Sequence, residues 1–242
     1  METNFGQEVV PPQLHQIDYN LVYTKFFLCY NLTGDIMKLI FGTTNARKTE
    51  DLQNIINELG LDIEVLSMSD IGWDRGEIDE NGSTIEENSL IKAQSIYDFC
   101  VANNIQLPIL TDDAGLFVEV LGDEPGIYTA RYADDELALD SSLPKHQCVL
   151  KLLRKLNNEH NRKAKYRCCV TCMMPSGEYF QEVSESEGTI AEDIIGELKK
   201  PYFYSVFVLN GTTVAFNELG AKELKNTYRY TALRKSLKRL WT

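Results

Sequence analysis

The 242-residue sequence lacks both a hydrophobic run long enough to cross a membrane and an excess of basic residues. A membrane-spanning helix needs about 20 consecutive apolar residues. Lys and Arg number 24 against 36 Asp and Glu, for a formal net charge of −12, whereas nucleic-acid binding is driven by Lys and Arg that neutralise phosphates. We therefore expect neither a membrane protein nor a nucleic-acid-coating protein. An anionic ligand would need a local group of cations or a divalent metal.

Histidine is also scarce, and cysteine does not form a metal-binding pattern. The three His have no ligand or triad spacing, and the C-x-x-C formed by Cys169 and Cys172 lacks a second pair or a His at ligand spacing. The segment KYRCCVTCMM alternates like a buried strand, in which residues three apart point to opposite faces. We expect buried, reduced thiols in the reducing environment of the cytoplasm.

The first 36 residues lack the basic stretch that opens a secretory signal, although a short apolar segment, LVYTKFFLCYNL, follows. Met37 then begins MKLIFGTTNARK, which resembles the start of a domain. We predict an N-terminal extension of unknown role at 1–36 and a single domain at 37–242.

From residue 37 onward, strand-like and helix-like periodicities alternate. Pro144 favours a helix start, and the turn 175–177 separates two strands of a hairpin. This order predicts an α/β fold with a mixed central sheet flanked by helices. The expected strands are 37–43, 62–68, 108–111, 166–174, 178–186 and 203–211, and the expected helices are 45–59, 84–102, 144–156 and 227–240.

Three segments carry ionic groups at strand ends or helix starts. In FGTTNARK, free N–H groups at a helix start and Lys48 suit a phosphate, although a capped helix with a solvated Lys gives the same pattern. In TIEENSLIKA, Glu87 and Lys92 are either site residues or surface charges. In LTDDAG, Asp112 and Asp113 are like charges whose proximity is costly without a nearby cation or metal. Strand ends gather ligands in α/β sheets, and carboxylates such as Glu87 and Asp113 suit Mg²⁺.

Five motifs in this order, TTNARK, TIEENSLIKA, LTDDAGLFVEVLGDEPGIYTARYA, KYRCCVTCMM and KNTYRYTALRKSL, resemble the inosine-triphosphate pyrophosphatase family. The resemblance runs from about Met37 to Leu237. It implies hydrolysis of deaminated purine nucleoside triphosphates such as ITP, XTP and dITP to the monophosphate and pyrophosphate. It also implies Mg²⁺ as cofactor and a homodimer.

The resemblance further implies roles for individual residues. The loop 43–48 would hold the triphosphate, with Lys48 and Lys92 neutralising it. Glu87 and Asp113 resemble the metal-site acids, and Asp113 would orient or deprotonate the attacking water; Asp112 would support the metal's water shell or be structural. The expected substrate-binding residues are Thr43, Thr44, Asn45, Lys48, Lys92, Ala114, Tyr202, Lys225, Tyr228 and Arg229.

The sequence departs from the family at the base end of the site. Ala114 replaces a Ser or similar small residue, and the G-F-G-Y-D-P motif is not recognisable in ELKKPYFYSVF, where Tyr202 or Phe203 either stacks on a purine or belongs to a core strand. The S-H-R motif reads TYR at 227–229, which leaves Arg229 as the expected donor to the 6-oxo group. An upstream Lys corresponds to Lys222 or Lys225. We therefore expect relaxed or shifted base preference.

Two other interpretations remain open at this point. One is a non-catalytic member that keeps the fold to bind a nucleotide or a partner, since site chemistry and not fold must carry a function. The other is the related pyrophosphatase family that acts on modified pyrimidine nucleotides, whose loop signature differs from TTNARK. The leader before residue 37 and the altered base motif also fit a member released from a larger precursor, such as a viral polyprotein.

Overall fold

The first helix and the two strands around it form where the sequence predicts them. In the computed structural model, which describes residues 36–241, β1 (Met37–Phe41) and β2 (Ile63–Leu66) are parallel neighbours joined by α2 (Ala46–Leu59). The Asn45 side chain caps α2 by accepting a hydrogen bond from the Arg47 N–H, and Gly60 ends it at φ 64°, a left-handed conformation that glycine adopts without steric cost. The extension predicted at 1–36 lies outside the described residues, apart from Ile36.

The second helix, α3 (Ile85–Ala102), begins at a reciprocal cap. The Thr84 hydroxyl accepts from the Glu87 N–H, while the Glu87 carboxylate accepts from both the N–H and the hydroxyl of Ser83. These bonds satisfy backbone donors that the first turn of a helix leaves without partners. Glu87 is thus engaged in starting the helix.

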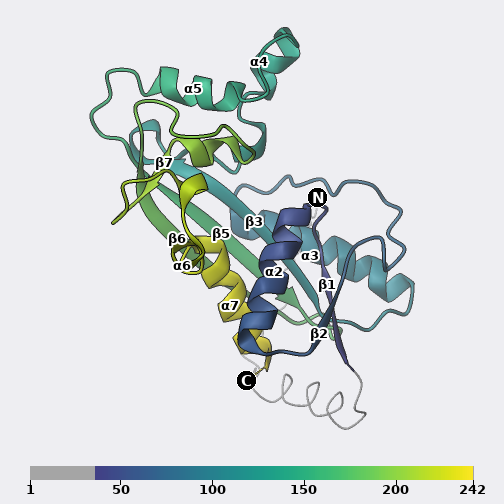
Figure 1. Cartoon of the computed structure of the whole chain (residues 1–242). Coiled ribbons are helices and arrows are strands. Elements are labelled where there is room, and N and C mark those ends of the chain that lie inside the picture. The colour runs from purple at the N-terminus through teal and green to yellow at the C-terminus, as the bar shows by residue number, and fades with distance from the viewer. Residues whose placement is uncertain (1–35, 242) are drawn as a thin grey trace, which may run out of the picture. The chain divides into compact units, whose positions relative to one another are not determined.

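The connection through α2 and the connection through α3 cross the sheet in opposite directions along its strand order. The chain passes from β1 through α2 to β2 on one side, then back through α3 to β3 (Ile109–Val118), which pairs in parallel with β1 on the other side. Because such crossovers are right-handed, the two helices cover opposite faces, and Figure 1 shows α2 and α3 on opposite sides of the sheet. The reversal between β1 and β3 is the point at which open α/β sheets form a ligand crevice.

Strand β3 is longer than the strand predicted at 108–111. It pairs over its full length with β5 (Lys163–Met173), whereas β1 pairs only as far as Leu110 and β4 (Glu124–Gly126) joins the same edge at Leu116. Asp112 and Asp113 therefore lie within the strand. The neighbouring strand β1 ends near them. Among the described strands, none pairs with this edge of β3 between Leu110 and Leu116.

The remaining strands complete a mixed sheet in the order β2-β1-β3-β5-β6-β7, with β4 beside β3. The predicted hairpin is confirmed as β5 and β6 (Tyr179–Ile190) around the turn at 174–177. The strand predicted at 203–211 is only partly correct. A 3₁₀ turn, η3 (Tyr202–Ser205), replaces its first half, and β7 (Phe207–Leu209) forms the second.

Helices on the two faces close the core. The C-terminal helix α7 (Tyr228–Trp241) packs on β5 and β6 beside α2, and α3 packs on β3 and β5 (Figure 1). No helix within 36–241 is both long and apolar enough to cross a membrane. The shorter helical elements are η1 (Glu119–Leu121), η2 (Thr129–Arg131), α4 (Asp134–Leu139), α5 (Gln147–Lys155), η4 (Phe216–Glu218) and α6 (Ala221–Leu224).

Candidate active site

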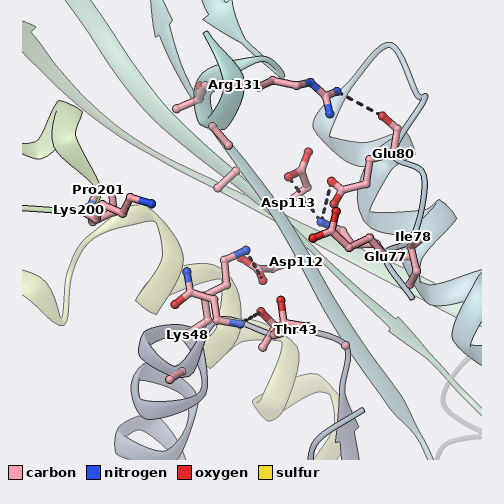
Figure 2. Close-up of a pocket in the computed structure, with 18 of the residues that line it drawn as sticks. Thr43, Lys48, Glu77, Ile78, Glu80, Asp112, Asp113, Arg131, Lys200 and Pro201 are labelled. Atoms are coloured by element: carbon pink, nitrogen blue, oxygen red, sulfur yellow. Dashed lines mark hydrogen bonds and ion pairs between the residues drawn. The ribbon is translucent and has the colours of Figure 1, made fainter. Parts of the chain in front are cut away.

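A cavity of about 1620 Å³ opens at the crevice between the ends of β1 and β3. Its walls come from the β1–α2 loop, the middle of β3, the loop before α3, the segment around α4 and α5, and the residues of η3 and the start of α7. In Figure 2, Lys48, Asp112 and Asp113 lie in its middle, with Glu77 and Glu80 toward one end and Lys200 and Pro201 toward the other. The cavity thus has a charged centre and two distinct ends.

Asp112 is a fully buried carboxylate held by two cations. Its Oδ1 lies 2.9 Å from Lys48 Nζ of α2, and its Oδ2 lies 3.3 Å from Arg229 Nε of α7. Burial alone would raise the pKa of Asp112, but Lys48, Arg229 and Lys92 together outweigh that effect and hold the pKa well below its usual range. Asp112 is therefore ionised at neutral pH, and its ion pairs tie both helices to β3.

Asp113 meets a different environment because neighbouring residues of a strand point to opposite faces. Its Oδ1 lies 3.6 Å from Lys92 Nζ of α3, and Lys92 also contacts Glu80 at 3.0 Å. Burial raises the pKa of Asp113 and Glu80 raises it further, against the opposing charge of Lys92. The Asp113 Oδ2 atom is buried and has no hydrogen-bond partner within 36–241, so one carboxylate oxygen is left for a ligand or water.

This arrangement explains why two acids are adjacent in the sequence. Asp112 faces the side of the sheet covered by α2 and α7, and Asp113 faces the side covered by α3, so each meets cations of its own. Opposite charges within about 4 Å favour the ionised forms. The cation that the sequence predicts for this pair is present as three side chains, Lys48, Lys92 and Arg229.

The β1–α2 loop supplies the polar rim of the cavity. Thr43 accepts a hydrogen bond from the Asn45 N–H, and Asn45 in turn caps α2. The exposed residues of this loop and the positive end of α2 suit a phosphate group. The loop, the Lys48 side chain and the backbone around Ala114 all line the same cavity.

Aromatic side chains form the end of the cavity opposite Glu80. Tyr202 lines it and contacts the His146 ring edge-on, with centroids 6.4 Å apart; Phe203 also lines it, although its side chain is largely buried. Tyr228 is also buried and bonds through its hydroxyl to Tyr204. A flat apolar group with a polar edge fits this end, as an anion fits the centre.

Most of the predicted site residues are brought together, but two are not. The cavity is lined by Thr43, Thr44, Asn45, Lys48, Lys92, Asp112, Asp113, Ala114, Tyr202, Tyr228 and Arg229. Lys225 instead pairs with Glu58 at 3.0 Å, and Glu87 is occupied at the cap with Ser83, outside the cavity lining. Arg229, expected to face a base, turns its guanidinium toward Asp112.

Sequence reasoning missed Glu80, Tyr166 and Tyr204, all of which line the cavity. Glu80 precedes the Asn81-Gly82 turn, which marks a loop tip but gives no sign that the loop folds back onto Lys92. The cysteines of the predicted strand at 166–174 are buried, as expected: Cys168, Cys169 and Cys172 lie in β5, and burial raises their pKa values.

Comparison with known proteins identifies the class. A crevice at the switch point of a mixed α/β sheet, with Lys and Arg side chains and a helix N-terminus at its centre, is typical of proteins that bind phosphorylated ligands. The family model of the Ham1 family matches residues 39–239, and this chain belongs to that family.

Individual relatives agree with this assignment. The chain is 34% identical over 197 residues to a dITP/XTP pyrophosphatase of Porphyromonas gingivalis, covering 81% of this chain and 92% of the relative. It is 33% identical over 207 residues to that of Bacillus subtilis, covering 85% and 98%. Its structure resembles the Staphylococcus aureus Ham1 protein with a TM-score of 0.67 at 25% identity, covering 84% and 97%. A HAM1 protein from Coxiella burnetii shares the fold with a TM-score of 0.70 at 22% identity, covering 85% and 98%.

Proposed function

We propose that this protein hydrolyses deaminated purine nucleoside triphosphates, such as ITP, XTP and dITP, to the nucleoside monophosphate and pyrophosphate. The observation that carries the proposal is the buried, unpartnered Asp113 Oδ2 beside a cluster of cations in a cavity with an aromatic end. The relatives that match over nearly their whole length are named dITP/XTP pyrophosphatases, which supports the substrate class.

The reaction adds water across the α–β phosphoanhydride bond. The water oxygen bonds to the α-phosphorus, the bond from that phosphorus to the bridging oxygen breaks, and pyrophosphate leaves. Asp113 has an oxygen available to accept the water's proton, and its raised pKa suits a general base better than that of Asp112. Lys48 and Lys92 oppose the charge of the phosphates.

We infer that Mg²⁺ binds at the acidic end of this cavity, where two carboxylates are available, although residues 36–241 bring together no group of three or more His, Cys, Asp or Glu side chains that could hold a metal by themselves. Glu80 and Asp113 Oδ1 both lie close to Lys92 Nζ, so two hard oxygen donors are near each other, and binding of the ion through Oδ1 would leave Asp113 Oδ2 for the water. We propose that these two residues hold the ion, with Glu80 in the role that the sequence assigned to Glu87. A bound Mg²⁺ would supply Lewis-acid stabilisation of phosphate charge.

Pyrophosphate release from ITP, XTP, dUTP, GTP and ATP with Mg²⁺ tests the proposal. We expect cleavage of ITP and XTP, and a loss of at least about 100-fold in kcat for Asp113→Asn, since general-base and metal roles contribute factors of this size. Asp62→Asn, an exposed acid outside the cavity, is the matched control and keeps full activity. A wild-type protein that binds ITP without cleaving it would favour the non-catalytic alternative, and cleavage of dUTP alone would favour the pyrimidine alternative.

We also propose a cytoplasmic homodimer. The buried free thiols of β5 fit a reducing compartment, and the dimer is the state implied by the family resemblance. Light scattering on the purified protein would check the dimer, and a monomer at micromolar concentration would contradict it.

A further inference from the structure

Three tyrosines from distant parts of the chain meet at the aromatic end of the cavity. Tyr166 of β5, Tyr204 of η3 and Tyr228 of α7 all line it, and they are only 3%, 4% and 2% exposed. The Tyr166 and Tyr228 rings are stacked, with centroids 5.0 Å apart and planes 9° apart, and Tyr204 packs edge-on against Tyr166 at 5.3 Å. Packing this tight fixes the position of each hydroxyl.

The hydroxyl groups of this tyrosine cluster have unused hydrogen-bonding capacity. The Tyr204 and Tyr228 hydroxyls bond to each other at 2.5 Å, and either can be the donor. The hydroxyl that accepts this hydrogen bond can still donate its own proton to a third group. The Tyr166 hydroxyl is buried and has no partner within 36–241, a state that costs free energy until a ligand or water satisfies it.

Arg229, the cation beside the tyrosine cluster, cannot both donate and accept hydrogen bonds. Arg229 carries donors only, and its guanidinium lies between Asp112 at 3.3 Å and Asp51 at 3.9 Å. Those carboxylates orient it toward the charged centre of the cavity. The hydroxyls of the tyrosine cluster, unlike the guanidinium, can both donate and accept.

We propose that the tyrosine cluster reads the six-membered edge of a purine and accepts both 6-oxo and 6-amino bases. This inference rests on the proposed function. A 6-oxo purine presents an acceptor at O6 and a donor at N1, and a 6-amino purine presents the reverse. Because the Tyr204–Tyr228 bond can reverse its direction and the Tyr166 hydroxyl can rotate, the cluster can match either pattern without leaving a buried polar group unpaired.

A site whose hydrogen bonds can reverse direction discriminates less between 6-oxo and 6-amino purines than a site with fixed donors and acceptors. Sites whose buried polar groups hold one orientation reject the mismatched analogue strongly, because those groups lose their partners. We therefore expect the ratio of kcat/KM for ITP over ATP to stay below about 100 in the wild type, well short of the factor that a fixed hydrogen-bonding site reaches.

Tyr→Phe variants test the cluster directly. In Tyr166→Phe, and in the double variant Tyr204→Phe/Tyr228→Phe, we expect kcat/KM to fall about 3- to 10-fold for ITP and for ATP alike, the usual effect of one lost neutral hydrogen bond. Tyr179→Phe on β6, outside the cavity, is the matched control and leaves both values unchanged. Tyr166→Phe removes a hydroxyl that has no partner within the described residues, so it folds at least as well as the wild type and carries the test if the double variant does not fold.

Two results of the kinetic assays would overturn the inference. One is a wild-type preference for ITP over ATP above about 100-fold; the other is a loss of kcat/KM confined to ITP in the Phe variants, which would reveal a hydroxyl that acts only as a donor.

Calorimetric measurement of IMP and AMP binding separates this inference from the proposed function. If no triphosphate is cleaved, the proposed function fails, while equal weakening of IMP and AMP binding in Tyr166→Phe still supports the cluster. Unchanged binding of both would refute it.

Discussion

Asp112 and Asp113 show how two adjacent residues of one type acquire different chemistry. The strand turns them to opposite faces, so that Asp112 meets Lys48 and Arg229 while Asp113 meets Lys92 and Glu80. Their pKa values consequently move in opposite directions. Residue type alone would not separate a structural anion from a reactive one.

The first prediction concerns the Asp112 anion. In Asp112→Asn we expect the free energy of unfolding at pH 7 to fall by about 3–5 kcal/mol, because Lys48 and Arg229 lose their buried counter-charge. Since the pKa of Asp112 is lower in the folded than in the unfolded protein, the wild type holds this stability above the unfolded pKa and loses it as the pH falls through the lower, folded pKa. Urea unfolding at several pH values in chelator, with Asp62→Asn as control, measures both effects.

The Asn variant lacks that acid-sensitive contribution, so the two stability curves converge as the pH drops. Curves that instead stay parallel down to strongly acidic pH would show that Asp112 is not the titrating anion.

The second prediction distinguishes Glu80 from Glu87. Glu80→Gln should raise the Mg²⁺ concentration at half-maximal activity at least about tenfold, because it removes a proposed ligand. Glu87→Gln should leave that concentration unchanged and lower the thermal midpoint, since its carboxylate caps α3 through Ser83. Mg²⁺ titrations of activity and thermal melts of both variants distinguish the two roles. A raised Mg²⁺ requirement in Glu87→Gln and not in Glu80→Gln would instead support Glu87 as the metal-site acid.

At the scale of elements, the position of the site follows from where β1 stops. β1 ends at Phe41 while β3 continues to Val118, and β4 pairs with the same edge only from Leu116. Gly115 lies in this gap, and a Cβ there would meet the Gly126 carbonyl oxygen at 2.4 Å. The backbone of β4 therefore approaches β3 as closely as it does because residue 115 has no side chain.

The third prediction tests this close approach. Gly115→Ala should lower the free energy of unfolding by about 1–3 kcal/mol through overpacking, and should also reduce kcat because Asp113 is two residues away. Gly60→Ala, strained by its positive φ but surrounded by open space and outside the cavity, should lower stability alone. Urea unfolding and initial rates on both variants compare the two, and a Gly115→Ala enzyme with full stability would contradict the argument.

The sequence predicts local elements better than it predicts the site. Periodicity and caps locate α2, α3 and the β5–β6 hairpin because these depend on nearby residues. The true length of β3 and the 3₁₀ turn at Tyr202 depend on where other strands stop and on the aromatic packing around Tyr166. The sequence does not predict Glu80 at the site because this residue precedes the Asn81-Gly82 turn, and only the folded loop brings it to Lys92.

At the scale of the whole molecule, an acidic chain concentrates its cations where an anion is to bind. The net charge is −12, yet Lys48, Lys92 and Arg229 converge on one cavity. Each of these cations also faces a carboxylate of the same cavity, so they can contact a bound triphosphate without making the cavity as a whole positive. The negative net charge of the chain disfavours unselective binding to nucleic acids.

The fourth prediction concerns residues 1–35. Among the described residues, those that line the cavity lie within 42–229, inside the unit formed by 36–241. A chain that starts at Ile36 should therefore fold and keep kcat/KM for ITP within about twofold of the full chain, as expected of a compact unit with its own core. Parallel purification and assays of the two chains test this, and a large loss of activity would assign the first 35 residues a part in catalysis.

The gap along β3 between Leu110 and Leu116 has one further consequence, for solubility. Unpaired strand edges invite other chains to add a strand, and proteins usually protect them with charges, prolines or covering elements. Here the open stretch lies in the cavity that carries Asp112, Asp113 and the cations around them. Enclosure and charge keep it from templating aggregation, so the protein can present bare backbone to a small ligand without presenting it to its own copies.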